Sequence, residues 1–238
     1  MPLETLVDKA VFLADALAAR FVEEGRRAVS TRGAFTVALT GGSVATTFFP
    51  RLAQVDFDWS KTDFFWGDER AVPPDHPDSN YALAWSLWLK PVGAPQSRIH
   101  RMPADAPDLR AAAAAYEREL EARAGRPPRL DLVLLGVGPD GHVCSLFPGH
   151  SLLAEKSRWV AAVEDSPKPP PRRLTLTLPS LVSAELVVIA ALGASKAAVV
   201  REALEDKESR LPIALVARQA RRTLILLDPE AARRIRPR

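Results

Sequence analysis

The chain has 238 residues, of which 47% are hydrophobic and 26% are charged. These proportions are typical of a soluble folded protein and exclude a chain that is disordered throughout. The net charge of +3 comes from basic residues scattered along the chain, without the concentrated stripe of Lys and Arg that nucleic-acid-binding proteins carry. We therefore expect a single domain over 1–238 and no nucleic-acid partner.

Cysteine content and apolar runs indicate the compartment. Cys144 is the only cysteine, so no intrachain disulfide can form and a reducing environment is expected. Acidic residues interrupt the apolar pattern of residues 1–21, so this stretch does not resemble a signal peptide. The sequence also lacks the run of about 18 apolar residues that a transmembrane helix needs. The expectation is a cytoplasmic protein without a membrane partner.

In the first half of the chain, helical and strand patterns alternate. Apolar residues at helical spacing predict an amphipathic helix over 4–24. Two runs of β-branched and aromatic residues, within 35–43 and 62–70, predict strands that end in polar turns. Helical patterns recur over 81–89 and over 107–125.

Short apolar runs dominate the second half of the chain. The run "LDLVL" precedes a third polar loop, and later runs predict further strands and one helix. The strands are expected over 159–163, 173–179, 185–193, 211–216 and 223–227, and the helix over 195–206. Apolar strands that alternate with helices indicate a mostly parallel, Rossmann-like three-layer α/β fold. The alternating pattern "RLTLTL" instead suggests an exposed strand in a small antiparallel appendage.

Four polar loops follow predicted strands. They are "TGGS" (40–43), "GDER" (67–70), "GPDGH" (138–142) and "GASK" (193–196). In an open parallel sheet, ligands bind in the crevice outside the carboxyl ends of the strands. The four loops are therefore expected to meet at one edge of the sheet and to form the active site.

The loop "LGVGPDGHVCSLFPGH" allows more than one interpretation. Its three glycines fit the G-x-G-x-x-G pattern of dinucleotide-binding loops, but that motif needs a helix that begins inside the glycines, and Pro139 and Asp140 stand there instead. A catalytic interpretation uses His142 as a base that titrates near neutrality and Asp140 as the carboxylate that orients it. A structural interpretation, in which His142 only caps a turn, fits the local sequence equally well.

The turn "TGGS" is a candidate phosphate site. Thr40 and Ser43 offer hydroxyl groups, and Gly41 and Gly42 leave backbone N–H groups open to a ligand. An ordinary strand-to-helix turn would have the same composition. The turn is not a P-loop, because no Gly-Lys-Ser/Thr follows it.

Charged residues at other strand ends could complete the site. Arg70 offers a planar fork for an oxyanion or a phosphate, and Asp68 could orient it. Arg173 lies at the start of a predicted strand, and Lys196 lies near a helix start, where the helix dipole adds to its attraction for a phosphate. Each of these could equally be a solvated surface charge. The histidines show no metal-ligand spacing, so no metal and no cofactor are expected.

Taken in this order, the loops resemble the 6-phosphogluconolactonase family. The resemblance is carried by "LTGGS" (39–43), "GDERAVPPDHPDSNY" (67–81), "GVGPDGHVCSLFPG" (136–149), "RLTLT" (173–177) and "GASK" (193–196). It implies hydrolysis of 6-phospho-D-glucono-1,5-lactone to 6-phospho-D-gluconate in the oxidative pentose phosphate pathway. It also implies an α/β fold of the sugar-phosphate isomerase/deaminase type, a small-molecule phosphosugar lactone as the binding partner, no metal, and commonly a monomer.

The resemblance also implies roles for individual residues. His142 resembles the general base that takes a proton from the attacking water, and Asp140 resembles the residue that orients its ring. The phosphate turn would comprise Thr40, Gly41, Gly42 and Ser43, with Arg173 and Lys196 as its cationic side and with Asp68 and Arg70 lining the same pocket. Val44 is a departure, because the family often has Pro at that position.

Two other functions remain open on the sequence. Glucosamine-6-phosphate deaminases have a similar glycine turn and a similar "GPDGH" loop, but "DERAVPPDHPDSNY" and "SLFPG" favour the lactonase. The third candidate is a non-catalytic module that senses sugar phosphates. Such a module would need an attached DNA-binding segment, and the predicted N-terminal helix leaves little room for one.

Overall fold

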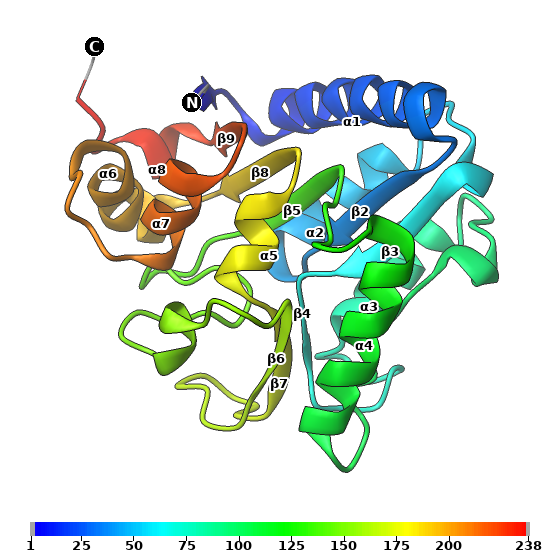
Figure 1. Ribbon diagram of the computed structural model, residues 1–238. Helices are drawn as coiled ribbons and strands as arrows, with labels where there is room; N and C mark the ends of the chain where they lie inside the picture. Colours follow the sequence, from blue (N-terminus) through cyan, green and yellow to red (C-terminus); the bar gives the residue numbers. More distant parts are fainter. Residues whose placement is uncertain (1–2, 237–238) are drawn as a thin grey trace.

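The computed structural model describes residues 3–236 (Figure 1). Its largest feature is a six-stranded sheet in the order β1-β9-β8-β5-β2-β3, in which every neighbouring pair is parallel. The strands are β1 (Leu3–Val7), β2 (Phe35–Leu39), β3 (Thr62–Trp66), β5 (Leu132–Gly136), β8 (Leu186–Ala191) and β9 (Thr223–Leu227). All except the edge strand β1 are buried along nearly their whole length, as expected for a parallel sheet covered by helices.

Helices connect the strands and surround the sheet. They are α1 (Ala10–Arg32), α2 (Gly42–Leu52), α3 (Asn80–Ala84), α4 (Leu109–Ala124), α5 (Leu178–Ser183), α6 (Ala197–Glu205), α7 (Pro212–Gln219) and α8 (Pro229–Ala232). Figure 1 shows α6, α7 and α8 grouped near β9 and α1 running along one side of the sheet. No helix within residues 3–236 is both long enough and apolar enough to cross a membrane.

Two adjacent aromatic residues of β3 show that helices cover both faces of the sheet. Consecutive residues of a strand point to opposite faces. The ring centroid of Phe64 lies 5.5 Å from that of Trp88, which packs against Phe21 of α1 at 5.3 Å. The ring centroid of Phe65 lies 5.9 Å from that of Tyr116 of α4. Because α1 and α4 cover opposite faces, the predicted three-layer α/β fold is confirmed.

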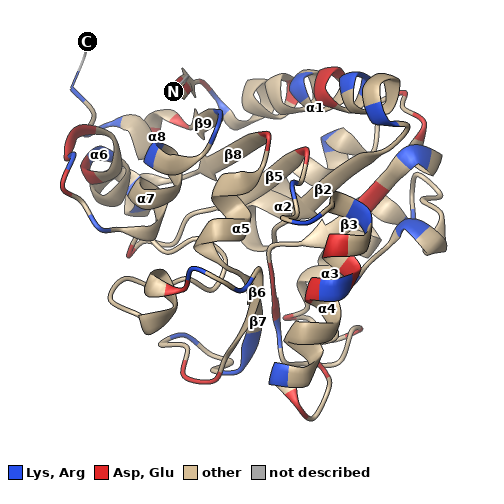
Figure 2. Cartoon of the chain, in the orientation of Figure 1, with Lys and Arg blue, Asp and Glu red and all other residues tan. Residues whose placement is uncertain are grey.

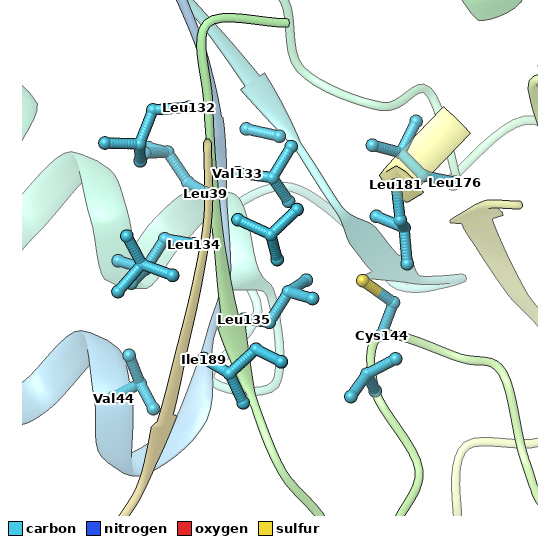
Figure 3. Packing of buried hydrophobic residues seen from close by; sticks show 14 of the residues in the cluster. Leu39, Val44, Leu132, Val133, Leu134, Leu135, Cys144, Leu176, Leu181 and Ile189 are labelled. Atoms are coloured by element: carbon cyan, nitrogen blue, oxygen red, sulfur yellow. The ribbon is translucent and has the colours of Figure 1, made fainter. Parts of the chain in front are cut away.

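The central strand β5 repeats this alternation with aliphatic residues. Figure 3 shows Leu134 on one side of the strand, towards Val44 at the start of α2. Leu135 points to the other side, towards Leu181 of α5 and Cys144. All of these side chains are at least 90% buried, so the loops that follow β2 and β5 stand on a tightly packed core.

A second, smaller sheet lies beside the first. It consists of β4 (Asp68–Arg70), β7 (Arg173–Leu176) and β6 (Val160–Val163), in that order and antiparallel, which confirms the predicted appendage. The expected exposure of its strand β7 was wrong, because all four residues of this central strand are buried. One residue, Gly67, separates β3 from β4. Its N–H donates to the Leu39 carbonyl of β2 at 2.8 Å, and its own carbonyl accepts from the N–H of Leu176 at 2.7 Å. A single residue therefore links the two sheets.

Two predictions about individual segments were wrong. The segment 211–216 was expected as a strand but belongs to α7, because Pro212 begins a helix and a short apolar run does not distinguish the two structures. The predicted helix over 4–24 is a strand, β1, followed by the longer helix α1. The helix ends at Gly33, whose φ of 78° favours glycine.

Charged side chains of both signs are interspersed on the surface helices. Figure 2 shows Lys and Arg alternating with Asp and Glu along α1 and α6. Many form ion pairs, such as that between Arg20 and Glu4 at 3.0 Å and that between Arg51 and Asp15 at 2.6 Å. The two charges of each pair neutralise one another, and exposed pairs of this kind contribute little to the stability of the fold.

Candidate active site

The order of the strands creates a crevice between β2 and β5. Within the main sheet, the strand that follows β2 is β3 on one side, whereas the strand that follows β5 is β8 on the other. At such a reversal, the loops after the two strands diverge and leave room for a ligand at the carboxyl edge of the sheet. A cavity of about 330 Å³ lies there. Its lining includes Thr40, Gly41, Gly42, Ser43, Asp68, Arg70, His142, Arg173 and Lys196. Every predicted site residue except Asp140 therefore lines one cavity, and Asp140 contacts His142.

The turn after β5 presents the histidine. The Gly141 N–H donates to the Gly138 carbonyl at 2.9 Å, and the Gly138 N–H donates to the His142 carbonyl at 2.9 Å. Gly141 has a φ of 84°, a conformation that side chains rarely allow. The next helical segment after β5 is a short turn at Ser151–Ala154, so no helix begins within the glycines. This geometry rules out the dinucleotide-binding interpretation of the loop.

His142 and Asp140 form a close pair. The His142 Nδ1 lies 2.6 Å from the Asp140 Oδ1, and the ring packs against Phe147 with centroids 4.8 Å apart. A carboxylate can only accept, so the ring proton is assigned to Nδ1. This tautomer leaves the lone pair on Nε2 available to accept a proton.

The charges around the pair favour a neutral ring beside a carboxylate. Burial lowers the pKa of His142, and the charge of Lys168 adds to this, although Asp140 opposes both through its hydrogen bond and its charge. Burial opposes ionisation of Asp140, but His142 and Lys168 outweigh it and lower the pKa of the carboxyl group. A neutral imidazole held by a carboxylate is the resting state that a general base needs.

The glycine turn after β2 begins a helix whose first N–H groups face the cavity. α2 starts at Gly42 without a side-chain cap, so its first N–H groups lack partners within the helix and can bind an anion. Gly42 has a φ of 63°, and a Cβ on Gly41 would overlap the Asn80 Oδ1. Both positions therefore require glycine. Val44, where proline was expected from the resemblance, is buried and does not interrupt the helix.

Asp68 and Arg70 reach the cavity from β4. The Asp68 carboxylate accepts from the Ser145 hydroxyl at 2.7 Å and from the Asn80 side-chain amide at 3.2 Å. The Arg70 Nη1 donates to the Asp78 carbonyl at 2.7 Å. The Nε of Arg70 is buried and has no hydrogen-bond partner within residues 3–236, while the residue itself lines the cavity.

Arg173 lines the cavity but is largely engaged with the protein. Its side chain donates to the carbonyl groups of Pro170, Lys168 and Pro169 at 3.0, 3.1 and 3.0 Å. Its Nη1 also lies 3.9 Å from the Asp68 carboxylate. The expected role on the cationic side of a phosphate is therefore shared with a structural one, because these bonds hold the proline-rich loop before β7.

Lys196 lies directly before α6, in the turn Ala194–Lys196. Burial lowers its pKa, and the charge of Lys168 acts in the same direction, whereas Asp140 opposes them. The proximity of Lys168 and Asp140 places Lys196 on the same side of the cavity as the His142 pair.

The structure adds residues that the sequence did not identify. Lys168 lines the cavity, and its Nζ lies 3.2 Å from both the Asp140 Oδ1 and the His142 Nδ1. Asn80 connects the Asp68 side chain to the glycine turn. The only sequence signal for Lys168 is a lysine among prolines, which does not indicate where the side chain points.

Glu69 holds residues of the site in place through hydrogen bonds. Its carboxylate is buried and accepts from the N–H groups of Arg70, Asn80 and Tyr81 at 2.8 Å each and from the Ser79 hydroxyl at 3.0 Å. Burial raises the pKa of Glu69, although these N–H groups oppose the shift. The interactions fix the start of α3 against β4 and so position Asn80.

The side chains that the structure describes do not form a metal site. Within residues 3–236, no group of three or more His, Cys, Asp and Glu side chains is arranged to hold a metal ion. The polar groups at the cavity include cationic side chains, backbone amides and the His142 ring, which suit an anionic ligand bound beside a base.

Comparison with known proteins agrees with this geometry. The chain is 42% identical over 232 residues to a probable chloroplastic 6-phosphogluconolactonase of Oryza sativa, covering 90% of this chain and 70% of that protein. It is also 42% identical over 234 residues to a 6-phosphogluconolactonase of Streptomyces coelicolor, covering 92% and 89% of the two chains. The structure of a 6-phosphogluconolactonase from Trypanosoma brucei superposes with a TM-score of 0.86 at 28% identity, covering 99% of each chain. Residues 8–225 match the family model described as glucosamine-6-phosphate isomerases/6-phosphogluconolactonase, and the chain belongs to that family.

Proposed function

We propose that this chain hydrolyses 6-phospho-D-glucono-1,5-lactone to 6-phospho-D-gluconate, a step of the oxidative pentose phosphate pathway. The observation that carries the proposal is the Asp140–His142 pair, joined at 2.6 Å, at the edge of a cavity rich in cationic side chains. A base next to an anion site suits a substrate whose reacting carbon lies several bonds from a phosphate group.

The phosphate group is expected to bind first and to orient the lactone. The N–H groups at the start of α2 and the ammonium group of Lys196 would surround it. Arg70 lines the same cavity, where its guanidinium group would attract the phosphate or the oxygen of the lactone carbonyl. Binding of this remote group places the carbonyl carbon beside His142, so that binding energy contributes to the reaction.

Hydrolysis then needs one base and no covalent intermediate. The His142 Nε2 takes a proton from a water molecule as its oxygen attacks the lactone carbonyl carbon, and Asp140 stabilises the imidazolium that results. When the tetrahedral intermediate collapses, the bond to the ring oxygen breaks. The imidazolium returns the proton to that oxygen, which becomes the hydroxyl group of the open-chain acid.

The same reasoning extends to cofactor, assembly and location. A lactone carbonyl is already electrophilic and its leaving oxygen is tethered, so we expect the reaction to proceed without a metal ion or cofactor. As the resemblance to the lactonase family implies, we expect the protein to act as a monomer. The single cysteine supports a reducing compartment such as the cytoplasm.

The test measures hydrolysis of freshly generated 6-phosphogluconolactone above the spontaneous rate, coupled to 6-phosphogluconate dehydrogenase. Glucosamine 6-phosphate is assayed in parallel for ammonia release, because the family includes both activities. We expect lactone hydrolysis without ammonia. The His142→Gln variant should lose about 10²–10⁴-fold in kcat, whereas His76→Gln, at an exposed histidine, should match the native protein. Ammonia release would establish the deaminase, and inactivity on both substrates would support a sensor.

A further inference from the structure

Lys168 enters the site from the small sheet. It lies in the loop 164–172 between β6 and β7, whereas Asp140 and His142 follow a strand of the main sheet. Its Nζ lies 3.2 Å from the Asp140 Oδ1, the same oxygen that accepts from the His142 ring at 2.6 Å. The ring proton and the ammonium group therefore share one carboxylate oxygen.

The loop that carries Lys168 is held in place by several hydrogen bonds. Arg173 donates to the Lys168 carbonyl at 3.1 Å and to the two following carbonyl groups. The Ser166 hydroxyl donates to the Lys168 carbonyl at 2.9 Å, and the Ser166 N–H donates to the Pro171 carbonyl at 3.0 Å. The backbone at Lys168 is thus fixed from both sides, so the side chain starts from a defined place beside the Asp140–His142 pair.

The charges that face the His142 ring come from four elements. Asp140 belongs to the same turn, Lys168 to the loop before β7 and Asp68 to β4. Lys196, before α6, interacts electrostatically with both Lys168 and Asp140. Of the two cations, Lys168 is the one in contact with the pair, and its side chain is 35% exposed.

We propose that Lys168 is a positioning residue for the Asp140–His142 pair, which holds the carboxylate against the ring and opposes a second proton on it. The proposal rests on the proposed function, in which His142 must be neutral to take a proton from water. Lys168 neutralises part of the Asp140 charge and so weakens the support that Asp140 gives to the imidazolium.

This arrangement serves both halves of the reaction. In the first half it keeps the resting ring neutral, so that Nε2 can act as a base. In the second half it makes the imidazolium a stronger acid, which returns its proton to the leaving ring oxygen more readily. A lysine on the Nδ1 side achieves this without occupying the Nε2 side, where the water must lie.

The test is a titration of the His142 ring in the free protein, followed by the NMR signal of its Cε1–H. The chain has four histidines, and the signal is assigned by its absence in His142→Gln. Loss of the charge in Lys168→Met should move the midpoint of the His142 titration to higher pH, whereas Lys168→Arg should leave it in place. Lys90→Met removes a charge from an exposed lysine and is the matched control, with no expected change.

Activity provides the second readout. The ratio of kcat/KM at about pH 7.5 to that at about pH 5.5 should rise about two- to fivefold in Lys168→Met, as expected for a partly exposed ion pair. Lys168→Gln replaces Lys168→Met if the latter does not fold. An unchanged His142 midpoint in these variants, even with a raised KM, would overturn the proposal and make Lys168 a substrate ligand. Because the titration contains no substrate, its result tests the role of Lys168 whatever reaction the protein catalyses.

Discussion

Gly138 offers a way to disable the His142 pair without altering either of its members. A Cβ built at this position would overlap the His142 ring at Nδ1 and Cε1 and would lie 2.5 Å from the Asp140 Oδ1. The φ of Gly138 is outside the left-handed range, so the backbone itself accepts alanine. Gly138→Ala should therefore displace the catalytic pair while leaving the remainder of the fold in place.

The size of the effect follows from this overlap. Non-bonded heavy atoms prefer separations of about 3.5–4.0 Å, so the carboxylate must retreat by about 1 Å and the ring must move at least as far. A misplacement of about 1 Å can cost about 10²-fold in rate, and full loss of a general base costs about 10²–10⁴-fold. We expect kcat/KM for the lactone to fall by about 10²–10³-fold in Gly138→Ala, with only a small change in melting temperature.

The assay is background-corrected lactone hydrolysis, with circular dichroism and thermal unfolding measured on the same preparations. Gly93→Ala is the matched control, because Gly93 has a φ of 63° and no atom lies within 4 Å of a Cβ placed there. That variant should lose about 1 kcal/mol of stability and no activity. A folded Gly138→Ala protein with activity within about threefold of native would refute the assignment of His142 as the base.

Three further outcomes are expected. Burial lowers the pKa of His142, and the neutral ring is the active form, so kcat/KM should decline only as the pH falls below the ordinary histidine pKa of 6.5. A pH–rate profile in which kcat/KM already declines above pH 6.5 would contradict this assignment. Lys196→Ala should raise KM for the lactone about tenfold or more with kcat nearly unchanged, and an unchanged KM would move the phosphate site elsewhere. Glu69→Gln should lower the free energy of unfolding, measured by urea denaturation, by about 1–3 kcal/mol. The reason is that the single amide oxygen cannot accept from the N–H groups of both Asn80 and Tyr81, which bind different oxygens of Glu69. Unchanged stability would show that the loop tolerates an unpaired N–H group.

The parts of the site that follow a strand directly could be predicted from the sequence. Thr40 and His142 come within six residues of the ends of β2 and β5, and parallel strands bring their carboxyl ends to one edge whatever the surrounding packing. Local sequence therefore sufficed to place both loops at one cavity. The roles of their residues remain predictions for the variants described above.

The contributions of the small sheet could not be predicted in the same way. Lys168 lies in a loop whose path depends on Arg173 and on the pairing of β7 with β4 and β6, and these contacts join distant parts of the chain. The sequence shows that Arg173 is cationic, but its neighbours in space decide how much of its charge is left for a ligand. The strand prediction for 211–216 was wrong for a related reason. A short apolar run fits a strand or a helix, and the elements packed around it decide which one forms.

The position of Gly67 between the two sheets has a consequence for the kinetics of binding. Since its N–H group is bound to the main sheet and its carbonyl group to the small sheet, the two walls of the cavity cannot separate at this point without losing at least one of these hydrogen bonds. The cavity is thus preformed and does not need the two sheets to close on the ligand. Capture of the phosphosugar should then depend on diffusion and on attraction by the cationic lining. Its rate constant should fall as ionic strength rises, and it should fall in inverse proportion to solvent viscosity.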